Sequence, residues 1–211
     1  MWRSMGGGQL EMKYLVTGTT SGIGKYIKQK LRGHELFEIN RADIDLNRPE
    51  LLLSVDLPVV DYAILNAGHD LGGGVPFVDH ESVSIQKILN CNLVSNVLIT
   101  QKLLKNNPNT VIVLITSTNI NRQYPNNLAY NLSKLGLKNL YDLIKIDYPD
   151  SKIKEARIGL TKTEFNNNRH KGNHKPINDL YTMKHMTPKN VADSILYLIN
   201  SEADFMELNA E

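Results

Sequence analysis

The feature that most constrains the fold is a glycine-rich turn near the start of the chain. Residues 13–18 (KYLVTG) are short, apolar and β-branched, which predicts a buried strand. Gly18, Gly22 and Gly24 follow with the spacing Gly-x-x-x-Gly-x-Gly, and a helical pattern runs on to about residue 33. Glycines let a backbone approach a ligand closely, and a helix N-terminus offers free N–H groups and a positive dipole. A turn of this kind after the first strand is typical of folds that bind the pyrophosphate of a dinucleotide.

The remaining chain alternates short apolar segments with segments of helical periodicity. Further strands are predicted at 35–40, 43–46, 60–66, 110–117, 153–159 and 205–209. Helices are predicted at 49–55, 81–106, 127–147 and 187–200, the last with Thr187 as its N-cap. Strands that are apolar on both faces and alternate with helices indicate an α/β fold. We expect a single Rossmann-like, doubly wound parallel sheet of about six or seven strands, with helices on both faces.

Length and charge limit the classes of protein to consider. The 211 residues fit one domain over 13–211, preceded by a disordered extension over 1–12. A net charge of +2 does not favour a nucleic-acid or membrane-surface partner. No apolar run reaches the ~20 residues that a bilayer span needs, and the first residues lack a signal peptide's apolar region. The expectation is a cytoplasmic protein that binds a small molecule, with Cys91 as a buried thiol.

Four side chains predict a site for acid–base chemistry. Tyr130 and Lys134 are four residues apart on a predicted helix and therefore share a face. A nearby ammonium favours phenolate and lowers the pKa of a tyrosine, which suits it to proton exchange near neutral pH. Ser117 ends the clearest strand, where open α/β sheets place their ligands, and its hydroxyl can bind a carbonyl. Asn92 lies mid-helix, where a buried amide needs hydrogen-bond partners.

The residues after the second strand bear on the choice of cofactor. An acidic residue at this position hydrogen-bonds the adenosine ribose, whereas an arginine can pair with a 2′-phosphate. The chain has Asn40 and Arg41 there. Arg41 therefore favours NADP(H) over NAD(H).

Together these motifs resemble the short-chain dehydrogenase/reductase family over about residues 13–200. Ser117 precedes Tyr130 by thirteen residues, which is the usual family interval. The other matching elements are the glycine-rich turn, Asp45–Leu46, Asn66–Ala67–Gly68, Asn92 and Tyr130-x-x-x-Lys134.

The resemblance implies an NAD(P)(H)-dependent oxidoreductase that interconverts a carbonyl and an alcohol by hydride transfer. Tyr130 would be the general acid/base, Lys134 would lower its pKa and hold the nicotinamide ribose, Ser117 would orient the substrate, and Asn92 would hold a water in a proton relay. The implied cofactor-binding residues are Gly18, Thr20, Ser21, Gly22, Ile23, Gly24, Arg41, Asp45, Leu46, Asn66, Ala67, Gly68, Tyr130, Lys134 and Thr163.

The chain also departs from the family pattern. Ile158–Gly159 stands where the family usually has Pro-Gly, although Thr163 keeps the position that touches the nicotinamide amide. The segment between the second and third strands is too short for a helix common in the family. The final residues, FMELNAE, lack a Gly-Gly tail, which leaves a homo-dimer and a homo-tetramer both open. A polar stretch around 164–186 corresponds to the substrate lid.

Two other functions remain open from the sequence. An epimerase or dehydratase of the same fold usually has a longer C-terminal substrate region. A non-catalytic cofactor sensor or scaffold usually loses the tyrosine or the lysine, and both are present here. No metal site is expected, since His170 and His174 lack carboxylate or cysteine partners at a supporting spacing.

Overall fold

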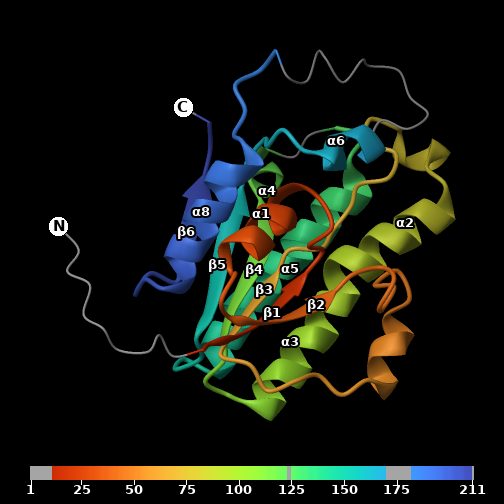
Figure 1. Ribbon diagram of the computed structural model, residues 1–211. Coiled ribbons are helices and arrows are strands. Elements are labelled where there is room, and N and C mark those ends of the chain that lie inside the picture. Colours follow the sequence, from red (N-terminus) through yellow and green to blue (C-terminus); the bar gives the residue numbers. More distant parts are fainter. Residues whose placement is uncertain (1–10, 123–124, 170–181, 211) are drawn as a thin grey trace.

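A six-stranded sheet organises the chain in the computed structural model (Figure 1). The structure describes residues 11–122, 125–169 and 182–210. The strand order is β2-β1-β3-β4-β5-β6, and every neighbouring pair is parallel. The predicted doubly wound parallel sheet is therefore confirmed. Because the order reverses between β1 and β3, the carboxyl ends of these two strands flank a crevice where such sheets bind ligands.

The strands follow the apolar segments of the sequence closely. Their bounds are β1 Lys13–Thr17, β2 Glu35–Ile39, β3 Tyr62–Leu65, β4 Val111–Ser117, β5 Ile153–Ile158 and β6 Phe205–Leu208.

The α-helices of the described residues are α1 Gly22–Lys30, α2 Ser82–Leu89, α3 Ser95–Asn106, α4 Asn119–Arg122, α5 Leu128–Asp147, α6 Glu164–Arg169 and α8 Pro188–Ile199. Two 3₁₀ helices, η1 Pro49–Ser54 and η2 Phe77–Asp79, and a π-helical turn, η3 Asn90–Val94, complete the set. The predicted N-cap of α8 is confirmed, because the Thr187 hydroxyl accepts the Asn190 N–H at 3.2 Å.

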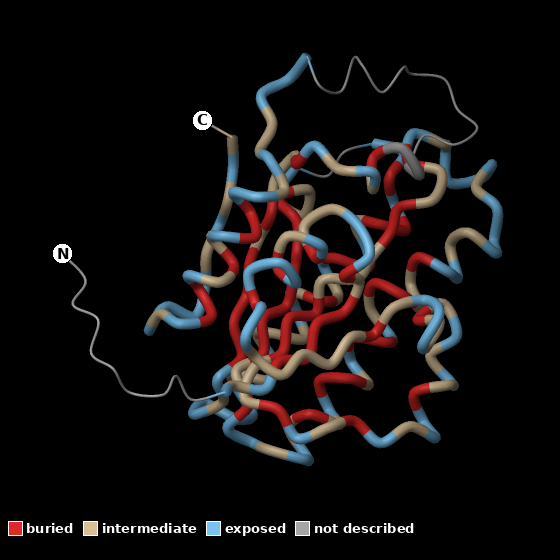
Figure 2. Tube along the Cα trace, in the orientation of Figure 1, coloured by how far each residue is buried: buried red, intermediate tan, exposed pale blue. Residues whose placement is uncertain are grey.

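Each face of the sheet carries its own apolar core, because successive strand residues point to opposite sides. In β4, Ile112 and Leu114 pack on the side of α3, α5 and η1, whereas Val113 and Ile115 pack on the side of α1 and α8. Figure 1 shows these helices on the two sides of the sheet, and Figure 2 shows the buried residues concentrated between the layers. Both faces are therefore covered, which explains why the strands read as continuous apolar runs.

The predicted long helix over 81–106 is interrupted by the π-helical turn at Asn90–Val94. A π-helical turn is wider than an α-helical turn, so its backbone carbonyls are open to donors from side chains. The Asn96 side-chain amide donates to the carbonyl of Cys91 at 3.2 Å and to that of Asn92 at 2.9 Å. Asn96 thus stabilises the widened turn.

Some predicted elements are wrong or shifted. Residues 43–46 form no strand, because the N–H groups of Asp43 and Ile44 both bond the Asn40 carbonyl in a turn. The short helices η2, α4 and α6 were not predicted. Of the expected extension over 1–12, residues 1–10 lie outside the described residues. Met12 packs against the core, and its carbonyl accepts the Glu35 N–H.

No helix of the described residues is both long and apolar enough to cross a membrane.

Two adjacent leucines of η1 test the packing of the β2–β3 connection. Leu52 is fully buried in the core, whereas Leu53 is 67% exposed. We expect Leu52→Ala to lower the free energy of unfolding by about 2–5 kcal/mol, through lost burial and the cavity left behind. Leu53→Ala should change it by less than about 0.5 kcal/mol. Urea denaturation of both variants measures this, and equal losses would contradict the packing of η1.

Candidate active site

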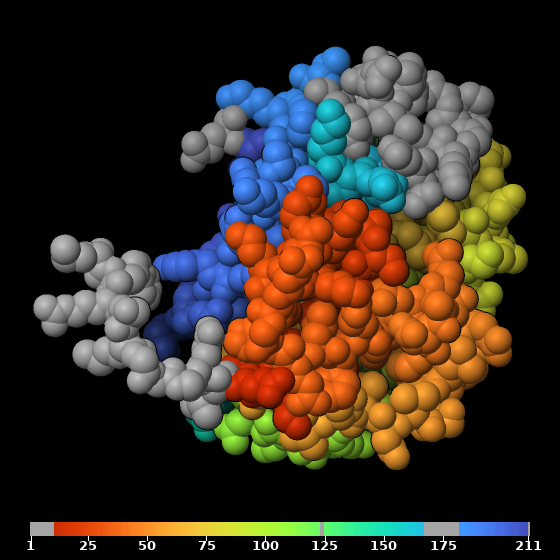
Figure 3. Space-filling view, viewed as in Figure 1, coloured from red at the N-terminus to blue at the C-terminus, as the bar shows by residue number. Residues whose placement is uncertain are grey.

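A cavity of about 680 Å³ opens at the carboxyl edge of the sheet. Its walls come from the β1–α1 turn and from the segments that follow β2, β3, β4 and β5, together with α5. In Figure 3 the turn and α1 (red to orange) lie beside α6 (cyan) at this end of the molecule. The predicted residues that line the cavity are Gly18, Thr20, Ser21, Gly22, Ile23, Arg41, Leu46, Asn66, Ala67, Gly68, Ser117, Tyr130, Lys134 and Thr163.

The glycine-rich turn folds back on itself more tightly than side chains would allow. Gly18 has φ +71°, a conformation that favours glycine. A Cβ on Gly24 would lie 2.1 Å from the carbonyl oxygen of Gly18. Gly24 does not line the cavity, so its role is to permit the close packing of the turn. Ser21, the N-cap of α1, makes no side-chain cap bond to the first turn of the helix.

The Asn66–Ala67–Gly68 segment, which follows β3, holds this turn in place. The Asn66 amide donates to the carbonyl oxygens of Thr17 and Gly18 at 3.2 and 3.0 Å. The Ala67 N–H donates to the Thr17 hydroxyl at 2.8 Å. The motif therefore fixes the end of β3 to the end of β1, in addition to lining the cavity.

The end of β2 presents a cation to the cavity. Arg41 lines the wall and is exposed. The Asn40 side-chain oxygen accepts the Thr19 N–H at 2.9 Å, which ties this end to the glycine-rich turn. Asp45, predicted beside the adenine, does not line the cavity. Its carboxylate accepts the backbone and side-chain N–H groups of Asn47.

The carboxylate of Glu38, on β2, does not line the cavity either. It accepts hydrogen bonds from Lys28 and from the Thr19 hydroxyl. Burial raises the pKa of Glu38, but these hydrogen bonds and the Lys28 charge outweigh it and lower the pKa overall. Glu38 is thus an anion held by a local partner.

The structure brings Ser117, Tyr130 and Lys134 together on one cavity wall. All three are buried, with 5–8% of each residue exposed. The Lys134 ammonium donates to the Ile115 carbonyl at 2.8 Å and lies 5.8 Å from the centre of the Tyr130 ring. Ser117 is the last residue of β4, and its hydroxyl accepts the Asn119 N–H at 3.2 Å. A phenol, an ammonium and a hydroxyl can there bind and protonate one oxygen atom.

Burial shifts the pKa of Lys134. It lowers the pKa from 10.5 to about 8, and the nearby Cys91 opposes this shift weakly. Cys91 is buried as predicted, and burial raises the pKa of its thiol to about 11. The ammonium therefore loses its proton closer to neutral pH than a surface lysine would.

Asn92 lies within the π-helical turn and does not line the cavity. It is fully buried. Its side-chain oxygen accepts the His69 N–H at 2.9 Å, and its amide donates to the His69 carbonyl at 2.9 Å and to the Ser133 hydroxyl at 3.1 Å. Because Ser133 precedes Lys134, these bonds join α5 to the segment after β3. The amide of Asn92 is thus used in positioning these two elements.

His69, which follows the Asn66–Ala67–Gly68 segment, also lines the cavity. Its Nε2 pairs with the Asn47 side-chain oxygen at 2.6 Å. Burial is the main cause that lowers the pKa of His69 to about 4, so the ring is neutral at pH 7.

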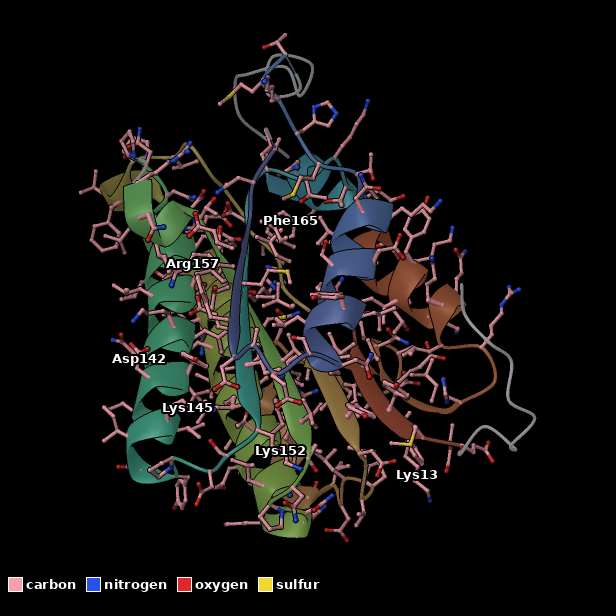
Figure 4. The ribbon with its side chains drawn as sticks, turned by 90° about the vertical axis from the view of Figure 1, so that its left-hand side faces the viewer. Lys13, Asp142, Lys145, Lys152, Arg157 and Phe165 are labelled. Atoms are coloured by element: carbon pink, nitrogen blue, oxygen red, sulfur yellow. The ribbon has the colours of Figure 1, made fainter. Side chains whose placement is uncertain are left out.

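The lining residues that were not identified from the sequence include Arg122, Phe165, Lys184 and Asn209. The Phe165 ring packs edge-on against Tyr130, with 5.8 Å between ring centres, and Figure 4 shows Phe165 at the cavity end of the sheet. Arg122 and Asn209 each follow a strand closely, and parallel strands bring such residues to one edge. That signal was available in the sequence.

The expected lid is described only in part. Its residues 164–169 form α6, and residues 170–181, including His170 and His174, lie outside the described residues. Among the side chains that the structure describes, no group of three His, Cys, Asp or Glu residues gathers as a metal site would require.

Comparison with known proteins places the chain in a family. The family model for short chain dehydrogenases matches residues 53–174, more than half of the chain. The chain therefore belongs to the short-chain dehydrogenase family. A search of curated protein sequences finds no match.

Solved structures share the fold at low sequence identity. A closed form of serine dehydrogenase complexed with NADP+ is 21% identical, with 93% of this chain and 94% of that chain covered and a TM-score of 0.78. A short-chain dehydrogenase from Sphingobium yanoikuyae in complex with NADPH is 18% identical (93% and 87% covered, TM-score 0.78). A 3-ketoacyl-(acyl-carrier-protein) reductase from Brucella melitensis complexed with NADH is 18% identical (95% and 98% covered, TM-score 0.77).

The burial of Lys134 predicts a pH-dependent stability. Between pH 8 and 10.5 Lys134 binds fewer protons in the folded state than in the unfolded state, so its contribution to the free energy of unfolding rises with pH across this window. Relative to Lys134→Met, which cannot titrate, the wild type should gain about 2 kcal/mol between pH 7 and pH 9.5. Urea denaturation at both pH values gives this difference. A difference that does not change with pH would show that Lys134 keeps an ordinary pKa.

Proposed function

We propose that the protein is an NAD(P)(H)-dependent oxidoreductase that interconverts a carbonyl and an alcohol. The observation that carries the proposal is the buried pair Tyr130–Lys134 on the wall of the cavity, beside Ser117 at the end of β4. Buried, perturbed ionisable groups in a cleft are typical of functional sites. Membership of the family and the nicotinamide cofactors in the similar structures support the same reading.

The cavity is suited to a dinucleotide. The N-terminus of α1 carries no side-chain cap, so its first N–H groups and the helix dipole can bind a pyrophosphate over Gly18 and Gly22. Leu46 and Ala67 would contact the adenosine half, and Lys134 and Thr163 the nicotinamide half. When bound, this cofactor supplies or accepts the hydride at the substrate carbon.

The protein's own residues handle the proton and the substrate oxygen. In the reducing direction, the Tyr130 hydroxyl donates its proton to the oxygen of the carbonyl as the hydride reaches its carbon. The ammonium of Lys134 stabilises the negative charge left on the tyrosine. The Ser117 hydroxyl hydrogen-bonds the same substrate oxygen and orients it. Asn92, through its bonds to His69 and Ser133, positions α5 and the segment after β3, and the water-holding role that the family resemblance implies stays a prediction.

NADP(H) remains the preferred cofactor in this proposal, because Arg41 lines the cavity after β2 and can pair with a 2′-phosphate. The carboxylate of Glu38, on β2, accepts hydrogen bonds from Lys28 and Thr19 and does not line the cavity, so it does not repel a 2′-phosphate bound at Arg41. Similar structures hold NADP+, NADPH or NADH and do not decide the preference. We propose further that α6 and residues 182–186 form part of a lid over the substrate end.

Replacement of Tyr130 tests the proton-transfer role. Tyr130→Phe keeps the ring and its contact with Phe165 but removes the proton donor, so turnover of a panel of ketones, aldehydes and quinones should fall at least about a thousandfold. Cofactor affinity, measured by quenching of NADPH fluorescence, should change less than about threefold. Tyr197→Phe, on the exposed face of α8, is the matched control. A Tyr130→Phe variant with a near-wild-type rate would refute the role. Tight cofactor binding without turnover in the wild type would favour a cofactor sensor.

Arg41 tests the cofactor preference. Arg41→Ala should weaken NADPH binding about tenfold or more and NADH binding much less, because only NADPH carries the 2′-phosphate. Arg48→Ala removes a nearby arginine that pairs with Glu50 and does not line the cavity, so it should leave both affinities unchanged. Equal losses for the two cofactors in Arg41→Ala would remove the basis for NADP(H).

A further inference from the structure

The lining of the cavity carries more positive than negative charge. Within the described residues, its charged lining consists of four cations and one carboxylate: Arg41, Arg122, Lys134, Lys184 and Glu164. The proposed function uses Arg41 for the cofactor and Lys134 for the proton. That proposal gives no role to Arg122 and Lys184. Cations that line a cleft attract ligands of negative charge, so these two residues bear on the charge of the substrate.

Arg122 belongs to the substrate end by its place in the sheet. It follows Ser117, the last residue of β4, by five residues, and α4, which carries it, packs against α5. Arg41 follows β2, and β1 and β3 lie between β2 and β4. At about 4.8 Å per strand spacing, the two arginines approach the cavity from positions roughly 14 Å apart.

A chain of polar contacts fixes the helix that carries Arg122. The Asn121 amide, adjacent to Arg122, donates to the Glu207 carboxylate of β6 at 3.3 Å. Glu207 also accepts from Arg157, which pairs with the buried Glu155 of β5. Figure 4 shows Arg157 between Phe165 and the opposite end of the sheet. The short helix is therefore anchored to two strands, so the arginine does not sit on an unsupported loop.

Lys184 reaches the same end from the other side. Met186, two residues later, pairs with Thr161 in the segment after β5, and Met183 lines the cavity as well. The single carboxylate, Glu164, also borders a second hollow whose other charged residues are Lys25 and Lys162.

We propose that the substrate carries an oxyanion, a carboxylate or a phosphate, which Arg122 binds with Lys184 as the second cation. A planar guanidinium matches either group in a bidentate arrangement, and Phe165 and the Tyr130 ring form the apolar wall beside it. This rests on the proposed function and adds the substrate class to it.

The experiment compares charged and neutral substrates of matched shape. With NADPH and NADH, kcat/KM is measured for acetoacetate against acetoacetamide, and for dihydroxyacetone phosphate against dihydroxyacetone. We expect the anion of at least one pair to be preferred by about ten- to a hundredfold, and the pair that shows it tells a carboxylate from a phosphate. Arg122→Gln should reduce that preference to less than about threefold, with kcat/KM falling far more for the anion than for its neutral partner.

Controls separate this inference from the proposed function. Arg32→Gln and Lys152→Ala remove exposed cations that do not line the cavity, and they should keep the preference. Figure 4 shows Lys152 at the end of the sheet opposite Phe165. Lys184→Ala should lower the preference less than Arg122→Gln, because an ammonium cannot form the two parallel hydrogen bonds that a guanidinium makes with an oxyanion.

Two results would overturn the proposal. In the first, the neutral compounds have the same kcat/KM as the matched anions. The proposed oxidoreductase function then holds, and the proposed substrate class is wrong. In the second, Arg122→Gln raises the KM for NADPH and leaves the preference intact, so the arginine serves the cofactor. If none of these four compounds turns over, the panel of ketones, aldehydes and quinones decides the proposed function separately. Calorimetry of the same four compounds with NADP+-loaded protein then tests whether the site binds an oxyanion. The proposal is wrong if the anions bind no more tightly than their neutral partners.

Discussion

The arrangement of the site depends on one close approach, between the glycine-rich turn after β1 and the segment after β3. The turn closes so tightly that the Cβ of any other residue at Gly24 would overlap the Gly18 carbonyl. The Asn66 amide then donates to the carbonyl oxygens of Thr17 and Gly18. Because β1 and β3 flank the point where the strand order reverses, this contact sets the floor of the cavity.

The second constraint is the burial of an ammonium that the fold itself does not require. Lys134 is buried against the Ile115 carbonyl and the Tyr130 ring, and burial disfavours its charged form. A hydrophobic side chain of similar size would pack there without that penalty. The elements around it are joined by polar contacts, since Asn92 links the His69 backbone to Ser133 on α5. The burial of Lys134 is explained if its charge stabilises the deprotonated form of Tyr130 during proton transfer.

Much of this was predictable from the sequence, because the decisive signals are local. Apolar runs predicted every strand of the sheet, and the spacing of Tyr130, Lys134 and Ser117 predicted the group on the cavity wall. The segment 43–46 was misread, since its alternating Asp and Ile mimic a strand while its N–H groups close a turn on Asn40. The widened turn at Asn92 depends on Asn96 one turn later, and the position of Asp45 depends on Asn47. Phe165 reaches the cavity through tertiary packing against Tyr130, which periodicity does not encode, whereas the place of Arg122 shortly after β4 was a signal that the sequence offered.

The most direct test of the proposed chemistry follows the hydride itself. The protein is incubated with NADPH deuterated at both C4 positions and with the carbonyl compound that gives the fastest turnover, and the alcohol formed is analysed by NMR. The proposal predicts deuterium on the carbinol carbon in one equivalent and none on the hydroxyl after exchange into water. Product without deuterium at that carbon would contradict hydride transfer within this cavity, and so would full retention of deuterium in the bound cofactor.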